Sequence, residues 1–244
     1  MPESSAGAGQ NRRDFLGKSA ISIAGAGLFA PALVLAQQEP APEQSKPKGD
    51  EEISPAEDLM REHGVLNRIL LIYDDHLRKL AAKQPFDGSV LASAADIVRH
   101  FVEEYHEKLE EDFLFPRLRK AGKLVSLVDT LQTQHKAGRE VTARIRELAG
   151  IATFKYVSDD SEKLGDALRA FVRMYRPHEA REDTVVFPAF RTIVSAHEYD
   201  ALGDDFEKKE DELFGEEGFF KVVDQVAQLE KRLGIYELAQ FTPK

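Results

Sequence analysis

The sequence predicts an all-α protein: an up-down-up-down four-helix bundle followed by a C-terminal helical extension. Apolar residues recur every three or four positions through four long segments, as in helices that bury one face. No segment of useful length alternates apolar and polar residues as a half-buried strand would. Short stretches with glycine or proline separate the segments, and short connections favour antiparallel neighbours. We expect the bundle at residues 54–194 and the extension at residues 195–244.

The N-terminus has the pattern of a signal peptide. Residues 11–18 read NRRDFLGK, an apolar stretch rich in Ala and Gly follows, and Val-Leu-Ala at 34–36 offers a cleavage site. The pattern resembles a twin-arginine export signal, so we expect residues 1–36 to be removed and the protein to be exported, to the periplasm. The apolar stretch is short and broken by glycine and proline, so no membrane span is expected in the mature form. Residues 37–53, rich in Pro, Glu, Lys and Gln, are expected to be a linker.

The first two helices of the predicted bundle have clear boundaries. A Ser-Pro-Ala-Glu capping box begins at Ser54 and puts proline in the first helical position, which predicts a helix from there to about Ala82. A Gln-Pro-Phe-Asp-Gly break follows. The second helix is expected from about Ser89 to Phe113, where Leu-Phe-Pro at 114–116 ends or kinks it.

The remaining helices follow from glycine stops and capping residues. A third helix is expected from about Lys123 to Ala149, with a glycine stop directly after it. The fourth is expected to start near the polar loop at 158–161 and to reach about residue 194, with a kink at Pro177. Two shorter helices, at about 195–213 and 218–233, form the predicted extension.

An internal repeat is the most informative feature of the chain. His-x-x-x-Glu, followed by Phe-Pro, occurs at His106–Pro116 in the second helix and again at His178–Pro188 in the fourth. Residues four apart lie one above the other on a helix, so each repeat presents an imidazole and a carboxylate in the same direction. One such pair is common on solvated helix faces, but two with matching flanks indicate a built site.

The first and third helices each add one histidine to this pattern. His63 and His135 lie on the apolar stripes of their helices, where an imidazole needs a partner. Either one alone could be a core histidine bonded to a carbonyl, but four helices converging in this way favour a metal site. Since the chain has no cysteine, the metal would sit on nitrogen and oxygen ligands, which suits Fe, Mn, Zn or Cu.

The order His, His-x-x-x-Glu, His, His-x-x-x-Glu resembles the hemerythrin-like HHE cation-binding proteins, over about residues 55–190. The resemblance implies a non-haem di-iron centre with an open iron position for dioxygen and carboxylate bridges from Glu110 and Glu182. The ligands that it implies, carried over position by position, are His63, His106, Glu110, His135, His178 and Glu182.

The chain departs from the invertebrate oxygen carriers of that family in the third helix. Those carriers have a second histidine four residues after the first, where this chain has Arg139. They also have an aspartate five residues after the last-helix histidine; Asp183 stands there, beside Glu182. Whether Glu107, Glu179 or Asp183 also coordinates is left open. A more anionic site favours ferric iron, which disfavours reversible oxygen carriage.

These features predict a protein that binds dioxygen, nitric oxide or peroxide for storage, scavenging or sensing. The alternatives are a di-iron oxidoreductase, a ferroxidase or a peroxide- or nitric-oxide-detoxifying enzyme with an external electron donor, and a mononuclear metal-handling bundle. The net charge of −10 without a basic stripe argues against nucleic acid as a partner. His76, His100 and His197 are expected at the surface or behind the ligands.

Overall fold

A computed structural model describes residues 53–149 and 159–243, all within one compact unit, Gln44–Lys244. The predicted signal peptide, 1–36, and the linker up to residue 52 lie outside the described residues. Every regular element that the structure describes is helical, so the all-α prediction is confirmed. No helix in the described part is long and apolar enough to cross a membrane.

The first helix, α1 (Pro55–Ala81), begins as its capping box predicts. Ser54 accepts a hydrogen bond from the backbone N–H of Glu57, and proline occupies the first turn. The apolar face of α1 is fully buried, with Leu59, Ile69 and Tyr73 each 0% exposed. Burial of this face, more than helix propensity, holds the element in place.

The second helical run continues through the position where an end or kink was predicted. It consists of α2 (Gly88–Ile97), the π-helix η1 (Val98–His106), α3 (Glu107–Leu109), the π-helix η2 (Glu110–Leu114) and α4 (Phe115–Lys120). Pro116 lacks an N–H, and its ring would press on the carbonyl four residues back in an α-helix. The helical turn before the proline is instead a wider π-turn. In it the N–H of Phe115 donates to the carbonyl of Glu110, five residues back.

The fourth run repeats this behaviour, whereas the third is a single α-helix. The third is α5 (Val125–Ala149); the fourth is α6 (Asp159–Arg181), the π-helix η3 (Glu182–Val186) and α7 (Phe187–Arg191). The predicted kink at Pro177 is not where the α geometry changes, because α6 continues through that residue. The change comes at η3, just before the second proline of the repeat, Pro188, and again starts at a glutamate, Glu182.

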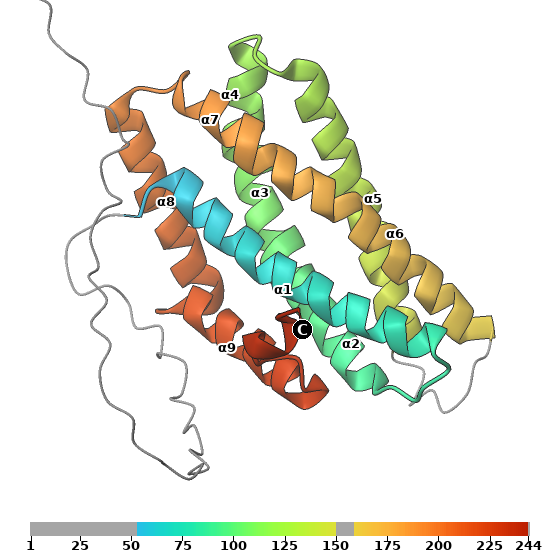
Figure 1. The fold of residues 1–244 in the computed structure, drawn as a ribbon. Helices are drawn as coiled ribbons and strands as arrows, with labels where there is room; N and C mark the ends of the chain where they lie inside the picture. Colours follow the sequence, from blue (N-terminus) through green and yellow to red (C-terminus); the bar gives the residue numbers. More distant parts are fainter. Residues whose placement is uncertain (1–52, 150–158, 244) are drawn as a thin grey trace, which may run out of the picture. The chain divides into compact units, whose positions relative to one another are not determined.

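The four runs pack around one core. Helix α1 contacts α6 and η1, and α5 contacts α6 and α2, so each run has two neighbours. In Figure 1 consecutive runs lie antiparallel to one another. Large aromatic side chains, among them Phe101, Phe171 and Tyr175, fill the space between them.

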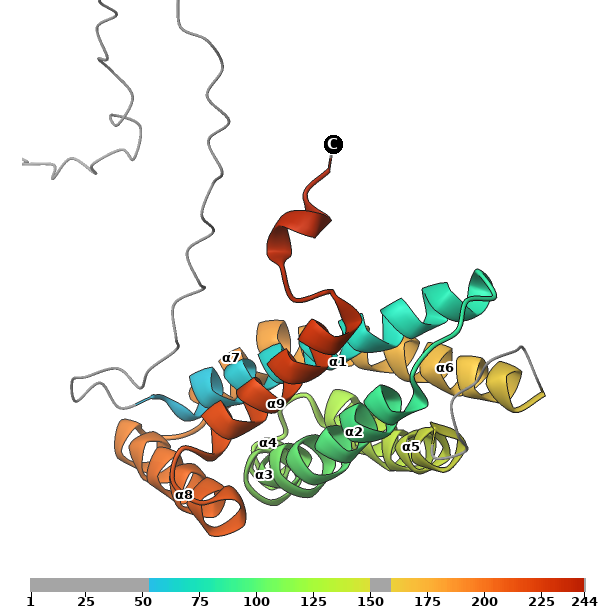
Figure 2. The same cartoon turned by 90° about the horizontal axis from the view of Figure 1, so that it is seen from below.

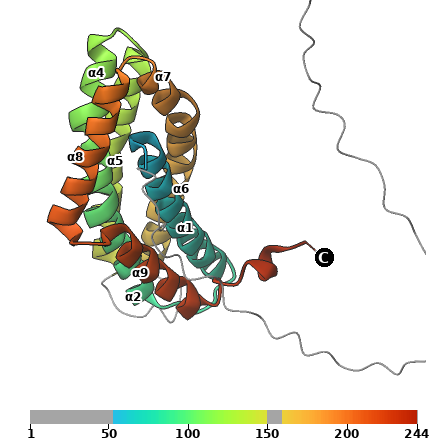
Figure 3. The same ribbon diagram turned by 90° about the vertical axis from the view of Figure 1, so that its left-hand side faces the viewer.

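The extension consists of α8 (Ala196–Phe214), α9 (Gly218–Leu233) and the short 3-10 helix η4 (Leu238–Phe241). Helices α8 and α9 cover the side formed by α1 and the second run (Figures 2 and 3). Phe206 and Val226 are 0% exposed, so the extension shares the bundle's core. Arg68 of α1 reaches Glu230 of α9 with two hydrogen bonds, at 3.0 and 2.6 Å.

Candidate metal centre

The six side chains predicted as ligands come from all four runs and meet inside the bundle. All are buried, with at most 4% of any residue exposed. They are His63 in α1, His106 at the end of η1, Glu110 at the start of η2, His135 in α5, His178 in α6 and Glu182 at the start of η3. Both glutamates are therefore the first residues of the π-helices that the Phe-Pro pairs produce.

One group of these atoms lies between α5 and α6. The Nε2 atoms of His135 and His178 are 3.2 Å apart. His135 Nε2 is 3.4 Å from Glu110 Oε2, and His178 Nε2 is 3.2 Å from Glu182 Oε1. Four potential ligand atoms, one from each residue, lie within 4.8 Å of one another, a spacing that one metal ion can fill.

A second group lies between α1 and the second run. His63, His106 and Glu110 offer ligand atoms within 4.8 Å of one another. His63 Nε2 is 3.5 Å from Glu182 Oε2, and His106 Nε2 is 3.9 Å from Glu110 Oε2. Glu110 thus belongs to both groups, and the two oxygens of Glu182 approach histidines of different groups. The carboxylates lie between the two pairs of imidazoles.

Every one of the four imidazoles is held from behind by a residue on another run. Each partner stands directly beside a predicted ligand in the sequence. Consecutive residues on a helix point about 100° apart, so the partner is directed at the adjacent helix and not at the centre. The Nδ1 contacts are His63 to Asp183 (2.7 Å), His106 to Glu62 (2.6 Å), His135 to Glu111 (3.1 Å) and His178 to Gln134 (2.9 Å). These bonds fix each ring with Nε2 toward the centre.

The centre is rich in acceptors and poor in donors. If each Nδ1 donates its proton outward, each neutral ring keeps a lone pair on Nε2. All four carboxylate oxygens of Glu110 and Glu182 are buried without a hydrogen-bond partner. Such groups are costly to bury unless a cation or proton satisfies them. The residues therefore fit metal ions bound by imidazole and carboxylate.

The electrostatics of the centre point the same way. Burial by itself lowers the pKa of His135, but the charge of Glu107 and the nearby Glu110 carboxylate raise it to about 10. Burial would raise the pKa of Glu182, yet the imidazoles of His178 and His63 hold it below its ordinary value. The carboxylates thus draw positive charge into the centre.

Of the residues left open as further ligands, Asp183 and Glu107 have other partners. Glu107 also offers a ligand atom within 4.8 Å of those of Glu111 and His135. Asp183 lies behind His63, on the Nδ1 side of its ring. Glu107 accepts a hydrogen bond from Tyr175 at 2.8 Å and pairs with Arg139 at 2.8 Å. Among the described residues, no group of three or more potential ligand atoms includes Glu179 or Asp183.

The sequence did not identify Glu62, Glu111 and Gln134 as partners of the histidines. Each stands directly beside a predicted ligand, and this adjacency was the signal that could have found them. The other histidines lie apart from the centre. His100 and His197 are exposed, as predicted. His76 was expected at the surface or behind a ligand, but it is fully buried. Its Nδ1 donates a hydrogen bond to the Ile72 carbonyl at 2.8 Å, and its ring packs on Phe86.

A family model agrees with this arrangement of histidines and glutamates. The hemerythrin HHE cation-binding domain matches residues 54–158 and, overlapping, 127–241. The chain belongs to this family. An uncharacterized protein of Mycobacterium bovis and uncharacterized proteins of two strains of Mycobacterium tuberculosis are each 48% identical to the hemerythrin-like chain over 202 residues, 83% of this chain and 77% of theirs. No solved structure matches it.

Membership in the HHE family was predicted from the residues that carry the chemistry, and it is confirmed. The two overlapping matches fit a chain in which the His-x-x-x-Glu and Phe-Pro unit is repeated. Together, the family and the buried histidine and glutamate groups fit a metal-binding protein.

Proposed function

We propose that this hemerythrin-like protein holds two iron ions between its four runs and uses them to bind dioxygen, nitric oxide or peroxide. The observation that carries the proposal is the sharing of carboxylates between two groups of ligand atoms. Glu110 belongs to both groups, and Glu182 approaches a histidine of each with a different oxygen. A single ion in one group would leave the histidines of the other group without a metal.

The residues divide naturally between the two ions. His135 and His178 would hold one, His63 and His106 the other, and Glu110 and Glu182 would link them. Nitrogen and oxygen donors without thiolate suit iron, and histidines and glutamates that project inward from four facing helices are typical of di-iron bundles. When bound, iron would supply an open position and a change of oxidation state to an incoming small molecule.

The phenylalanines of the repeat limit access of water to the centre. The ring of Phe115 stacks on His135 with centroids 5.5 Å apart, and that of Phe187 stacks on His63 at 5.6 Å. Each lies directly after the π-helix that starts at a linking glutamate. The Phe-Pro pair thus has two effects: proline produces the widened turn, and phenylalanine covers an imidazole of another run. A buried centre suits a small uncharged molecule.

We also propose that the protein works outside the cytoplasm, on the strength of the twin-arginine pattern at residues 11–18. Expression of the full chain with Arg12 and Arg13 both changed to Lys tests this. Export of the parent chain and retention of the variant in the cytoplasm are expected. Equal distribution of the two would contradict the proposal.

The gas-binding proposal is tested by spectroscopy of the reduced, iron-loaded full chain. Anaerobic addition of dioxygen or nitric oxide should produce a new charge-transfer absorption that saturates with a fixed ratio of ligand to iron pairs. Repeated consumption of dioxygen or peroxide with an added reductant would favour an oxidoreductase instead. No spectral change with either gas would contradict the proposal.

A further inference from the structure

A second acidic cluster lies beside the candidate metal centre and uses none of its six predicted ligands. It consists of Asp58 and Glu62 of α1 and Glu210 of α8, whose carboxylate oxygens lie within 4.8 Å of one another. Two of the three residues come from the bundle and one from the C-terminal extension. The cluster therefore exists only because α8 packs against α1.

A buried oxygen without a regular hydrogen bond points to a ligand in this cluster. Glu62 is 1% exposed, and its Oε2 accepts the bond from His106 at 2.6 Å. Its other oxygen, Oε1, is buried and makes no hydrogen bond of regular geometry. The Tyr105 hydroxyl, also buried without a regular partner, interacts with the Glu62 carboxylate. A buried carboxylate oxygen left in this way is unfavourable, and a bound cation is one of the few groups that can satisfy it.

The protein supplies too little positive charge to balance the three carboxylates. The nearest cation is Arg61, whose guanidinium is 3.6 Å from Asp58 and stacks on the ring of Phe219 at 4.3 Å. One guanidinium does not balance three carboxylates, so without a cation Asp58 keeps a proton at neutral pH. Burial, together with the charges of Glu62 and Glu210, raises the pKa of Asp58 to about 8.

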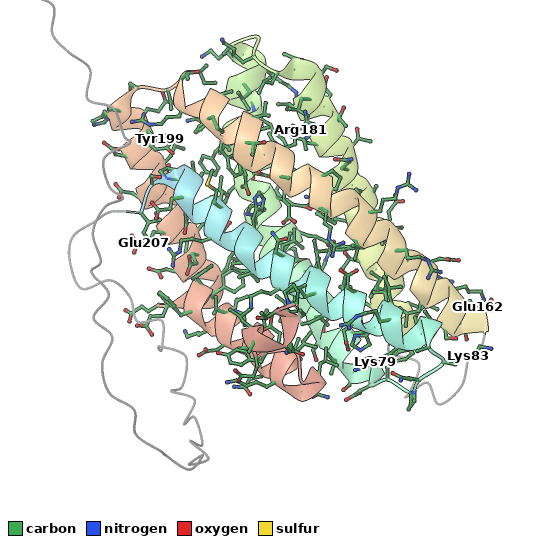
Figure 4. The ribbon with its side chains drawn as sticks, viewed as in Figure 1. Lys79, Lys83, Glu162, Arg181, Tyr199 and Glu207 are labelled. Atoms are coloured by element: carbon green, nitrogen blue, oxygen red, sulfur yellow. The ribbon has the colours of Figure 1, made fainter. Side chains whose placement is uncertain are left out.

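The cluster opens to solvent through a groove of about 940 Å³ between α1 and the extension. Asp58 and Glu210 line it, together with further acidic residues of α8 that include Asp204 and Glu207. Figure 4 shows the labelled Tyr199 and Glu207 along α8, beside the first half of α1. Carboxylates outnumber the two guanidiniums that line the groove, those of Arg61 and Arg191, and an excess of one sign of charge concentrates the opposite sign. Divalent cations therefore have both an entrance and a destination.

We propose that Asp58, Glu62 and Glu210 bind a further divalent cation of the hard class, such as Mg²⁺ or Mn²⁺, on oxygen ligands alone. Oxygen-only sites favour these ions over the softer metals. The extension completes the site through Glu210, which gives α8 a role beyond covering the core. Glu62 joins the cation to the imidazole of His106. The site does not depend on whether the larger centre holds iron.

The test is equilibrium dialysis of the metal-free full chain against saturating Mn²⁺, with bound ions counted by elemental analysis. Glu210→Gln should bind one Mn²⁺ per chain fewer than the wild type. Glutamine keeps an oxygen acceptor for the N–H of Phe219, which Glu210 Oε1 now binds at 2.6 Å, so the start of α9 is preserved. Asp58→Asn should lose the same ion, and this variant leaves the hydrogen bond between Glu210 and Phe219 untouched.

Asp204→Asn is the matched control, because it removes one charge from the same groove at an exposed position outside the cluster. It should bind as many ions as the wild type. Equal binding by the wild type, Glu210→Gln and Asp58→Asn would overturn the proposal, as would equal loss in all three variants. If the larger centre binds no metal, the wild type should still bind one Mn²⁺ and Glu210→Gln none, so the two proposals fail separately.

Discussion

Asp183 accepts a hydrogen bond from Nδ1 of His63 at 2.7 Å and so lies behind this imidazole, away from the other predicted ligands. Asp183→Ala should therefore weaken metal binding without removing a metal ion from the centre. Loss of such an outer partner typically lowers metal affinity about 10–100-fold. Asp183→Asn keeps an acceptor oxygen and should lose less. Competition with a chelator measures both effects.

The alternative for Asp183 is direct coordination. In that case Asp183→Ala would bind fewer metal ions per chain even at saturating metal, with an affinity for the remaining ion close to that of the wild type. Such a result would contradict the position of Asp183 behind the ring.

Gly138 and Tyr175 fit each other closely. A Cβ at position 138 would overlap the tyrosine hydroxyl and lie 2.9 Å from Cζ of its ring, which sits fully buried between α5 and α6. Gly138→Ala should therefore lower the free energy of unfolding by about 1–3 kcal/mol, the usual range for overpacking. Urea unfolding measures it. In a Tyr175→Phe background the same change should cost less, because the hydroxyl is absent.

Gly64 is the matched control for this comparison. It lies in α1, exposed, and a Cβ there would meet no atom within 4 Å. Gly64→Ala should raise stability by about 0.5–1 kcal/mol, because glycine is unfavourable inside a helix. An equal cost of Gly138→Ala in both backgrounds would show that the tyrosine hydroxyl does not set the requirement for glycine.

His76 should make the stability of the protein depend on pH. Burial lowers its pKa below the ordinary 6.5, so the folded protein keeps this ring neutral where the unfolded chain takes up a proton. The contribution of the neutral His76 ring to the free energy of unfolding is present above pH 6.5 and is lost as the pH falls below that value. The loss is at most about 1.4 kcal/mol per pH unit. Urea unfolding of the metal-free protein at pH 8, 7, 6 and 5 measures it.

His76→Leu removes the titrating group at similar volume. The variant should lose less stability than the wild type between pH 7 and pH 5, while both have a similar dependence between pH 8 and pH 7. If the two proteins had the same dependence throughout, the buried neutral state of His76 would be excluded as a source of acid sensitivity.

The all-α class, the helix positions and the convergence of the six predicted ligands could be predicted because they follow from local spacing. His106 and Glu110 are four residues apart and must share a helix face. His63 and His135 lie on apolar stripes and must face the core. The Ser54 cap sets the start of α1 directly from the sequence.

Features that depend on contacts between runs could not be predicted in this way. Glu62 is next to His63 in sequence, yet it supports His106 on a different run. Glu210 meets Asp58 only because α8 folds back across α1. The sequence predicts a helix end or kink at Pro116. Buried side chains on both sides of this proline hold the run together, and the turn before it widens into a π-helix. Tertiary packing decides each of these cases.

The iron content of the mature protein tests the central claim most directly. The protein is loaded with iron, washed in excess Mg²⁺ so that the oxygen-only cluster holds no iron, and measured by elemental analysis beside two variants. The wild type should hold two irons per chain, Glu110→Ala fewer than two, and the exposed control His100→Ala two. One zinc, no stoichiometric metal, or two irons in Glu110→Ala would contradict a shared-carboxylate di-iron centre.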